Sequence, residues 1–257
     1  MTSIRALIVG AALFAGSVAS ATAADLYRGG SIKDGYVAMP AVGPASWYVR
    51  GDIGYSNYDR PSMLEEGRFD LTNTSIDDQW SGGVGIGRYF GRSVRGDLTW
   101  DHRFETDARG TMSNMGGVDF PGQRTFGLKS DLFLANLYYD FNMGGRFAPY
   151  IGVGLGAVNN KTTSGSVPDN CICGFSNVSI AGASQWSVAG AFMTGFTVDL
   201  RDRLHLDAGY RLLYLGDAHT GVITGTRNGG GTATDGDPLV RDMWAQELRI
   251  GLRYDIR

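Results

Sequence analysis

The stretch SVRGDLTWDHRF, residues 93–104, decides the fold, because two kinds of side chain alternate along it. Successive side chains of a β-strand point to opposite faces of the sheet. One face then carries Val94, Gly96, Leu98, Trp100, His102 and Phe104, and the other carries Arg95, Asp97, Thr99, Asp101 and Arg103. The sequence therefore predicts a strand with one bulky, mostly apolar face and one charged face.

The same period of two recurs along the chain and predicts eight strands. They cover about residues 46–56, 78–89, 93–104, 127–141, 147–158, 184–199, 203–215 and 243–256. Tight turns around FGR, NMGGR and LRD join three pairs of neighbours, and the polar segments 57–77, 105–126, 159–183 and 216–242 join the others. Short turns at one end and long loops at the other are typical of a bacterial outer-membrane barrel, with periplasmic turns and extracellular loops. We expect the four long segments to be loops without secondary structure.

Side-chain volume predicts which face of the barrel points outward. All five tryptophans lie on the apolar face, whereas the opposite face of residues 79–87 consists of glutamine, serine and glycine. The interior of an eight-stranded barrel is just wide enough for side chains to fill, so the bulky face must point to lipid. The predicted fold is an all-β, eight-stranded antiparallel up-and-down transmembrane barrel. Its expected interfacial aromatic residues are Trp47, Trp80, Trp100, Trp186, Trp244 and Tyr254.

The tetrapeptide VRGD occurs twice, at residues 49–52 and 94–97. An adhesion ligand of the Arg-Gly-Asp type needs an exposed loop, but both copies fall on predicted strands, where the arginine and the aspartate point to the same side. We interpret both copies as parts of one inward network of opposite charges. The full interior set has equal numbers of basic and acidic residues, which can pair and fill the bore: Arg50, Asp52, Arg95, Asp97, Asp101, Arg103, Asp207, Arg211, Glu247, Arg249, Arg253 and Asp255.

The first two dozen residues indicate a targeting segment. Arg5 is followed by an apolar run and then by small residues that suit signal peptidase. We predict a signal peptide over 1–23, cleaved after Ala23 or alternatively after Ala24, an N-terminal periplasmic segment over 24–45 and a barrel over 46–257. No later stretch of the sequence approaches the length of an apolar transmembrane helix. The protein is therefore expected to be secreted through the inner membrane and to reside in the cell outer membrane.

Four stretches together resemble the outer-membrane β-barrel domain family, which includes small immunogenic surface proteins of alphaproteobacteria and opacity-type barrels. They are ATAADLY, WYVRGDIGY, PYIGVGLGAV and ELRIGLRYDI, and the resemblance covers essentially the whole mature chain. It implies an eight-stranded barrel, a role at the cell surface and in envelope integrity, and no catalysis. The implied partners are outer-membrane lipids and lipopolysaccharide, the insertion machinery that reads the C-terminal strand, and a host or small-molecule ligand at the extracellular loops. Family members typically end on an aromatic residue, whereas here Tyr254, Ile256 and Arg257 close the chain.

Smaller features leave alternatives open. Cys171 and Cys173 can form a disulfide in an oxidising compartment, but their spacing makes a strained ring, so two free thiols are also possible and a metal site is a weaker option. His205 is expected to point inward and join Asp207 and Arg211. The net charge of −3 provides no basic footprint for nucleic acid.

Three functions are compatible with the pattern. The leading one is a surface protein without catalysis or cofactor, which contributes to envelope structure and contacts host, phage or small ligands through its loops. The alternative is a narrow ion or small-solute channel lined by the inward charges. The second alternative is a lipid-modifying enzyme that uses His102. A nucleophile must lie within hydrogen-bond reach of its base, and no serine is clearly placed beside His102.

Overall fold

The computed structural model describes residues 47–59, 62–65, 69–113, 119–141, 145–166, 175–227, 230–235 and 238–256. The predicted signal peptide and the segment 24–45 lie outside the described residues, as do Cys171 and Cys173. Within the described part, no helix is long and apolar enough to cross a membrane.

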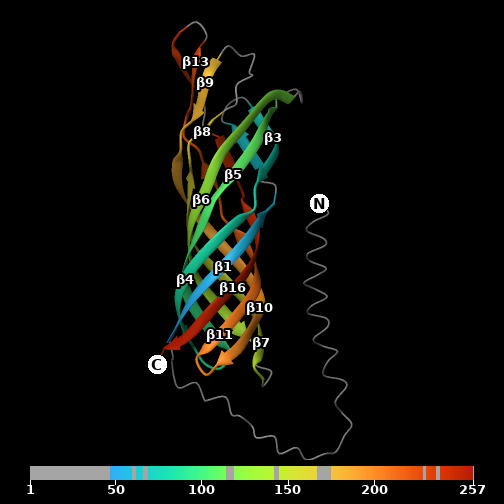
Figure 1. Ribbon diagram of the computed structural model, residues 1–257, viewed down its shortest axis with the longest axis vertical. Coiled ribbons are helices and arrows are strands. Elements are labelled where there is room, and N and C mark those ends of the chain that lie inside the picture. The colour runs from blue at the N-terminus through green and yellow to red at the C-terminus, as the bar shows by residue number, and fades with distance from the viewer. Residues whose placement is uncertain are drawn as a thin grey trace, which may run out of the picture. The chain divides into compact units, whose positions relative to one another are not determined.

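Eight long strands form a closed antiparallel barrel, which confirms the predicted fold (Figure 1). They are β1 (Trp47–Tyr58), β4 (Gln79–Tyr89), β5 (Val94–Ser113), β6 (Asp119–Asp140), β7 (Phe147–Thr162), β10 (Ala183–Arg201), β11 (Leu204–Tyr214) and β16 (Trp244–Ile256). Each strand pairs with the next in this order. The barrel closes where β16 pairs with β1, with Trp47 opposite Ile256.

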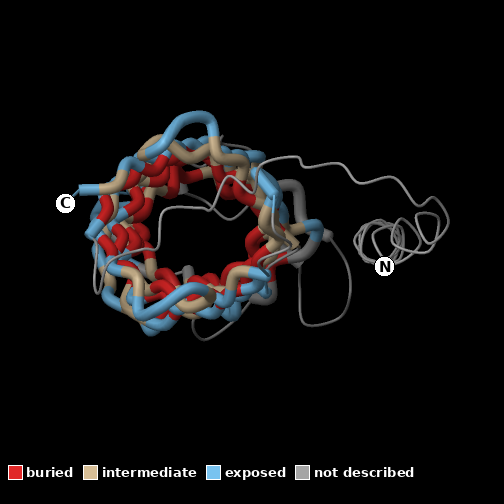
Figure 2. The backbone as a smooth tube through the Cα atoms, turned by 90° about the horizontal axis from the view of Figure 1, so that it is seen from below, coloured by how far each residue is buried: buried red, intermediate tan, exposed pale blue. Residues whose placement is uncertain are grey.

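The predicted alternation sets the inside and the outside of this ring. Along β1, buried and exposed residues alternate without interruption. Seen along the barrel axis, the buried positions line the inner side of the ring and the exposed positions line the outer side (Figure 2). Large aliphatic side chains are highly exposed on the outside, including Leu155 and Val188 at 72% and Leu248 at 64%. A continuous exposed apolar band of this kind is the lipid-facing surface of a membrane barrel.

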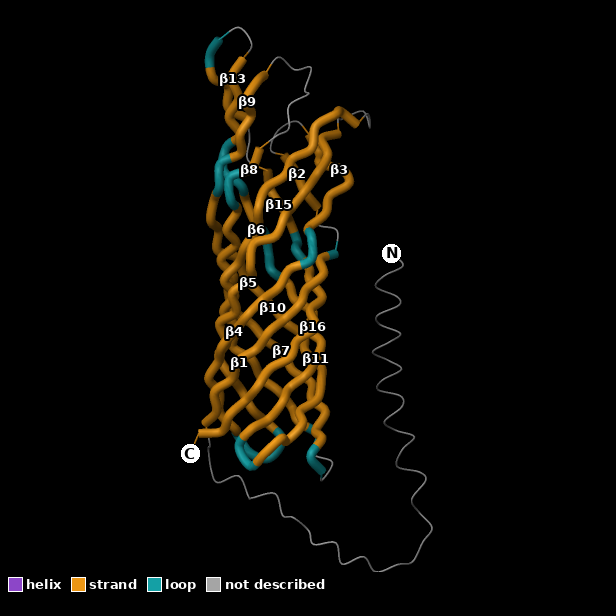
Figure 3. The backbone as a smooth tube through the Cα atoms, viewed as in Figure 1, coloured by secondary structure: helices purple, strands orange, loops and turns teal. Residues whose placement is uncertain are grey.

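The prediction of structureless long loops is wrong. Strands β5 and β6 continue as a paired ribbon beyond the barrel as far as Ser113 and Asp119, and eight further strands occupy the long segments (Figure 3). These are β2 (Ser62–Glu65), β3 (Phe69–Ile76), β8 (Gly165–Ser166), β9 (Phe175–Ile180), β12 (Ala218–His219), β13 (Ile223–Arg227), β14 (Thr232–Asp235) and β15 (Pro238–Arg241). Many of their pairings join segments far apart in the sequence, such as β15 with β2 and β13 with β9, so no local pattern reveals them.

The extra strands form two extensions at one end of the barrel. The series β12–β15–β2–β3 continues from β5, and the series β8–β9–β13–β14 continues from β6. The opposite end carries the short turns, as predicted. In the turn between β4 and β5, Gly91 has a φ of 142°, a conformation that residues with a Cβ rarely adopt. By the usual orientation of such barrels, the extensions are extracellular and the turns are periplasmic.

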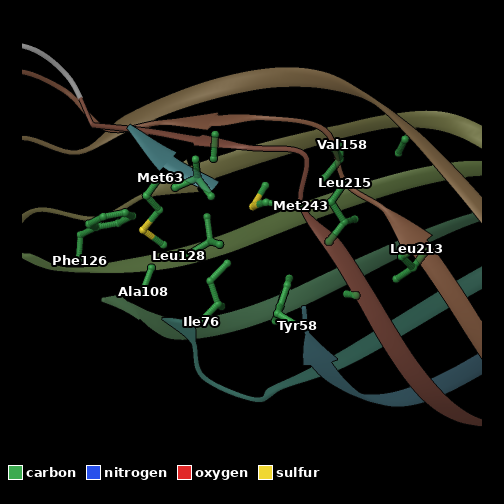
Figure 4. Packing of buried hydrophobic residues seen from close by; sticks show 14 of the residues in the cluster. Tyr58, Met63, Ile76, Ala108, Phe126, Leu128, Val158, Leu213, Leu215 and Met243 are labelled. Atoms are coloured by element: carbon green, nitrogen blue, oxygen red, sulfur yellow. The ribbon is translucent and has the colours of Figure 1, made fainter. Parts of the chain in front are cut away.

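A large apolar cluster fills the barrel interior near the extensions (Figure 4). Barrel strands contribute Leu128, Leu132 and Leu213, and the extracellular strands contribute Met63 and Val240. Each of these side chains is at most 2% exposed. The extension strands and the extracellular end of the barrel interior therefore share one hydrophobic core.

Candidate functional site

Charged side chains fill the barrel interior on the periplasmic side of the apolar cluster. Of the twelve interior residues expected from the sequence, the structure buries all but Arg249 and Asp255, which are partly buried. All twelve lie on β1, β5, β11 and β16. Strand β4 separates β1 from β5 in the barrel, so the charges of β5 must reach past it to meet those of β1, β11 and β16.

The first VRGD copy forms one centre of this interior charge network. The Arg50 guanidinium donates to Asp52 at 2.7 Å and, across the bore, to Asp97 at 2.9 Å. Asp97 also accepts hydrogen bonds from the Asn136 amide at 2.8 Å and the Tyr48 hydroxyl at 3.1 Å. Charge-assisted hydrogen bonds of this length are the strong ones, so both carboxylates are satisfied without water.

A second centre joins β5, β11 and β16. Asp101 accepts from Arg211 and from Arg249, each at 2.8 Å. Glu247 accepts a hydrogen bond from Arg103 at 2.8 Å and forms an ion pair with Arg211, whose guanidinium lies 2.7 Å away. Arg249 also reaches Asp52 on β1 at 2.9 Å, and so links this centre to the first one.

Arg95 of the second VRGD copy pairs with aspartates outside its own tetrapeptide. Its guanidinium lies 3.0 Å from Asp140 and 3.7 Å from Asp207, and it does not pair with Asp97. It also stacks over Tyr138, with 4.3 Å from its Cζ to the ring centroid. The two VRGD copies meet through Arg50 and Asp97, whereas Arg95 belongs to a third centre nearer the periplasmic turns.

The placement of His205 also corrects a prediction. Its ring nitrogens lie 2.5 Å from Asp199 and 3.0 Å from Asp255, and not beside Asp207 or Arg211. His205 lies two residues before Asp207, so its side chain points inward, as predicted. Its position along the barrel axis, however, brings it to other partners than the predicted ones. This position depends on the pairing register with β10 and β16, which a single sequence does not contain.

Glycines on β4 make room for the charges that cross it. A Cβ on Gly83 would lie 1.9 Å from the Asp101 carboxylate, and a Cβ on Gly85 would lie 2.8 Å from the Thr99 methyl group and 3.1 Å from the stem of Arg50. Neither site can hold a larger side chain unless a neighbouring group moves. The inner face of β4 is rich in glycine and therefore leaves the space that the charged side chains of β1 and β5 occupy.

Sequence reasoning missed two features of the interior. The first is Asp140, the main partner of Arg95. Every second residue of β6 points inward, as Asn136 and Tyr138 do, so the alternation of inward and outward residues predicts an inward Asp140 as well. The apolar cluster was missed because the inward face was expected to be small or charged. The inward parity of β6 in fact carries Leu128 and Leu132 near the extracellular end.

The six expected interfacial aromatic residues all lie on the outer surface and are 43–60% exposed. Trp47 and Tyr254 are near the periplasmic turns, and Trp80, Trp186 and Trp244 are near the extracellular ends of their strands. Several are packed against outward aromatic neighbours, such as Trp80 against Tyr55 at 4.9 Å between ring centroids. Rings of this kind at both ends of the apolar band are typical of membrane interfaces.

His102 also lies on the outer surface, on β5. Its Nδ1 is 2.8 Å from Asp131 on β6, and its ring packs edge-on against Phe104. Its neighbour on the other side, on β4, is Gly82. Within the described residues, no serine or threonine hydroxyl hydrogen-bonds to this imidazole.

Comparisons with known proteins fit this geometry. The family model described as outer membrane protein beta-barrel domain matches residues 9–255. An uncharacterized protein of Brucella abortus is 29% identical over 273 residues, which cover 94% of each chain. A putative adhesin of Rickettsia bellii is 25% identical over 224 residues, which cover 83% of this chain and 90% of the relative. Among solved structures, the outer membrane protein OprG from Pseudomonas aeruginosa has a TM-score of 0.49 at 14% identity, and the match covers 82% of this chain and 96% of OprG.

Proposed function

Because the chain belongs to the outer membrane protein β-barrel domain family, we propose that it is a surface protein without catalysis. In this proposal the barrel anchors the protein and adds to the structural integrity of the envelope. The extracellular strands form the surface that contacts a host molecule, a phage or a small ligand. The observation that carries the proposal is the contrast between a filled bore and a long, paired extracellular extension with a free strand edge at β14.

The filled bore supports an anchor over a channel. The periplasmic side is crossed by buried ion pairs such as Arg50 with Asp97 and Arg103 with Glu247. A void beside Arg50 measures about 10 Å³, roughly the space of one water molecule. On the extracellular side, the apolar cluster occupies the same bore. Side chains are expected to fill the interior of an eight-stranded barrel in this way. A pore would require both the ion pairs and the apolar cluster to move out of the bore.

The extracellular extension supports a role in surface interaction. Strand β14 is one end of the sheet, and one of its edges has no partner strand in the described part of the chain. The other end, β12, packs against the barrel, because Ala218 is 0% exposed and the His219 carbonyl accepts a hydrogen bond from the Thr162 hydroxyl. An unpaired strand edge presents a row of backbone donors and acceptors that another chain can use. The named relative in Rickettsia is a putative adhesin, which favours the same role here.

The enzyme alternative has less support. A hydrolytic histidine needs a nucleophile within hydrogen-bond reach. The lipid-facing neighbours of His102 across the strand pairs are Gly82 and Asp131, and neither carries a hydroxyl group. The His102–Asp131 pair has a further partner, Lys161, whose ammonium group lies 2.8 Å from Asp131. A charged surface site accounts for this arrangement better than a nucleophilic one.

Whole-cell binding tests the proposal. The hairpin β13–β14 would be replaced by a short turn, and the periplasmic turn at 90–93 would be altered in a control variant. Cells carrying each variant would be probed with host extracellular matrix proteins, and single-channel conductance would be recorded from the purified wild type. We expect loss of binding only in the hairpin variant and no conductance from the closed barrel. Unchanged binding after removal of each extension in turn, or a steady conductance, would contradict the proposal.

A further inference from the structure

Lysine is rare in this chain, and its placement is unusual. Only Lys33, Lys129 and Lys161 occur among 23 basic residues. Lys33 lies outside the described residues, and the other two are directly opposite each other on β6 and β7. Their neighbours along the strands, such as Leu128 and Asn160, are buried in the bore, so both lysines point to the outer surface.

The two lysines are not equally compensated. The Lys161 ammonium lies 2.8 Å from Asp131, and Asp131 is also held by the His102 ring at 2.8 Å. Lys129 has no ion-pair or hydrogen-bond partner within the described residues. Glu105, on the neighbouring strand β5, accepts a hydrogen bond from the Thr163 hydroxyl at 3.2 Å instead of pairing with Lys129. Like charges directly opposite each other on a sheet are destabilising, and within the described residues no anion compensates the Lys129 ammonium group.

The lysines lie at the extracellular boundary of the apolar outer surface. Each of the strands β5, β6 and β10 carries an exposed aromatic residue next to its outward polar residues, on the membrane side of them. These aromatic residues are Trp100, Phe133 and Trp186. The Phe133 and Trp186 rings are 6.0 Å apart and form a continuous patch. Amphipathic aromatic rings sit at the headgroup level of a membrane, and lysine stems extend along apolar surface while their charges reach the polar layer. The two ammonium groups are therefore placed at the headgroups of the outer leaflet.

We propose that Lys129 and Lys161 bind a phosphate group of an outer-leaflet glycolipid. The ligand is identified by the positive charge of the two ammonium groups and by their depth in the membrane. A phosphorylated lipid headgroup is the anion that contacts the barrel at the headgroup layer of the outer leaflet. Lysine binds phosphate as a compact point charge, and two of them across one strand pair can hold the same group. Asp131 and His102 position the Lys161 side chain. This site goes beyond the proposed surface function and does not depend on what the extracellular strands contact.

Native mass spectrometry of the purified full-length protein tests this site. The probes are bisphosphorylated lipid A, the same lipid after removal of its phosphates, and inorganic phosphate as a competitor. Lys129→Gln removes the uncompensated cation, and Lys129→Arg keeps a positive charge there. Arg88→Gln is the matched control, because Arg88 is also an outward cation but lies over Trp47 near the periplasmic end.

We expect Lys129→Gln to lower retention of the phosphorylated lipid about fivefold, the effect of one lysine at an anionic lipid surface. Lys129→Arg should keep most of the retention, and Arg88→Gln should leave it unchanged. The dephosphorylated lipid should be retained equally by all variants, and inorganic phosphate should not compete in detergent micelles at millimolar concentration. Equal losses for both lipids, or equal losses in Arg88→Gln and Lys129→Gln, would overturn the proposal. An unaltered heat-modification temperature in Lys129→Gln would show that the barrel itself is intact.

Discussion

The periplasmic and extracellular halves of the barrel interior fill the same narrow bore with opposite chemistry. In the periplasmic half, several arginines and carboxylates are as fully buried as any core residue, and both Arg103 and Glu247 are 0% exposed. In the extracellular half, the bore is filled by leucine, methionine and phenylalanine, with Leu213 also at 0%. Both halves follow the same alternation of inward and outward residues. The period of two thus fixes the direction of a side chain but not its chemistry.

The two halves also differ in how they connect to the rest of the molecule. The twelve interior charges expected from the sequence all come from barrel strands. The apolar half includes Met63, Leu71 and Val240 from the extracellular strands β2, β3 and β15. Shortening the extension would therefore expose the apolar half, whereas the charged half would keep its own partners. This difference predicts separate responses to mutation.

The largest expected effect is in the charged half. Glu247→Ala leaves Arg103 and Arg211 buried without their shared carboxylate. Breaking a buried pair in this way costs about 3–5 kcal/mol. We expect a clear fall in the temperature at which the folded barrel loses its distinct migration in gel electrophoresis. Glu247→Gln keeps the shape and one acceptor, so it should lose less. Equal stability of Glu247→Ala and wild type would show that water in the bore replaces the carboxylate.

The apolar half should respond to lost volume. Leu213→Ala removes a fully buried side chain from the cluster, and such changes cost about 2–5 kcal/mol. Leu212→Ala is the matched control, because Leu212 neighbours it on β11 but faces outward. Urea unfolding in detergent micelles would compare the two variants. If they unfold at the same urea concentration, the extracellular half of the bore is not a packed core.

The barrel strands could be predicted from the sequence, and the partners inside the barrel could not. Alternation is local, so residues 93–104 alone gave the direction of Arg95, Asp97 and Asp101. The partner of Arg95 is Asp140, and its identity depends on the register between β5 and β6. The extension strands were missed for a similar reason, since their pairings join segments far apart in the chain. The apolar half was missed because the small face of a few strands was taken to represent the whole interior.

The space between the two VRGD copies gives a smaller predicted effect. A Cβ at Gly83 would meet the Asp101 carboxylate at 1.9 Å, whereas at Gly82 the nearest atom would be 4.0 Å away. Gly83→Ala should therefore displace Asp101 and its arginine partners, and overpacking of this kind costs about 1–3 kcal/mol. Gly82→Ala adds the same methyl group on the outer face and should be neutral. Heat-modification temperatures of the two variants would measure the difference, and a neutral Gly83→Ala would mean that β4 can move outward.

The smallest effect is a coupling energy, and it separates the two possible pairings of the VRGD arginines. Asp97 contacts Arg50 at 2.9 Å and does not pair with Arg95. A double-mutant cycle of Arg50→Met with Asp97→Asn should give a coupling of about 0.5–3 kcal/mol, the range for residues in one network. The cycle of Arg95→Met with Asp97→Asn should give a much smaller value, although the two arginines share the ring of Tyr138. Urea unfolding of the six proteins would supply both values. A larger coupling for Arg95 would show that Asp97 pairs with Arg95 instead of Arg50. Loss of attachment to animal cells in any of these variants at unchanged stability would favour the hypothesis that the tetrapeptide is an adhesion ligand.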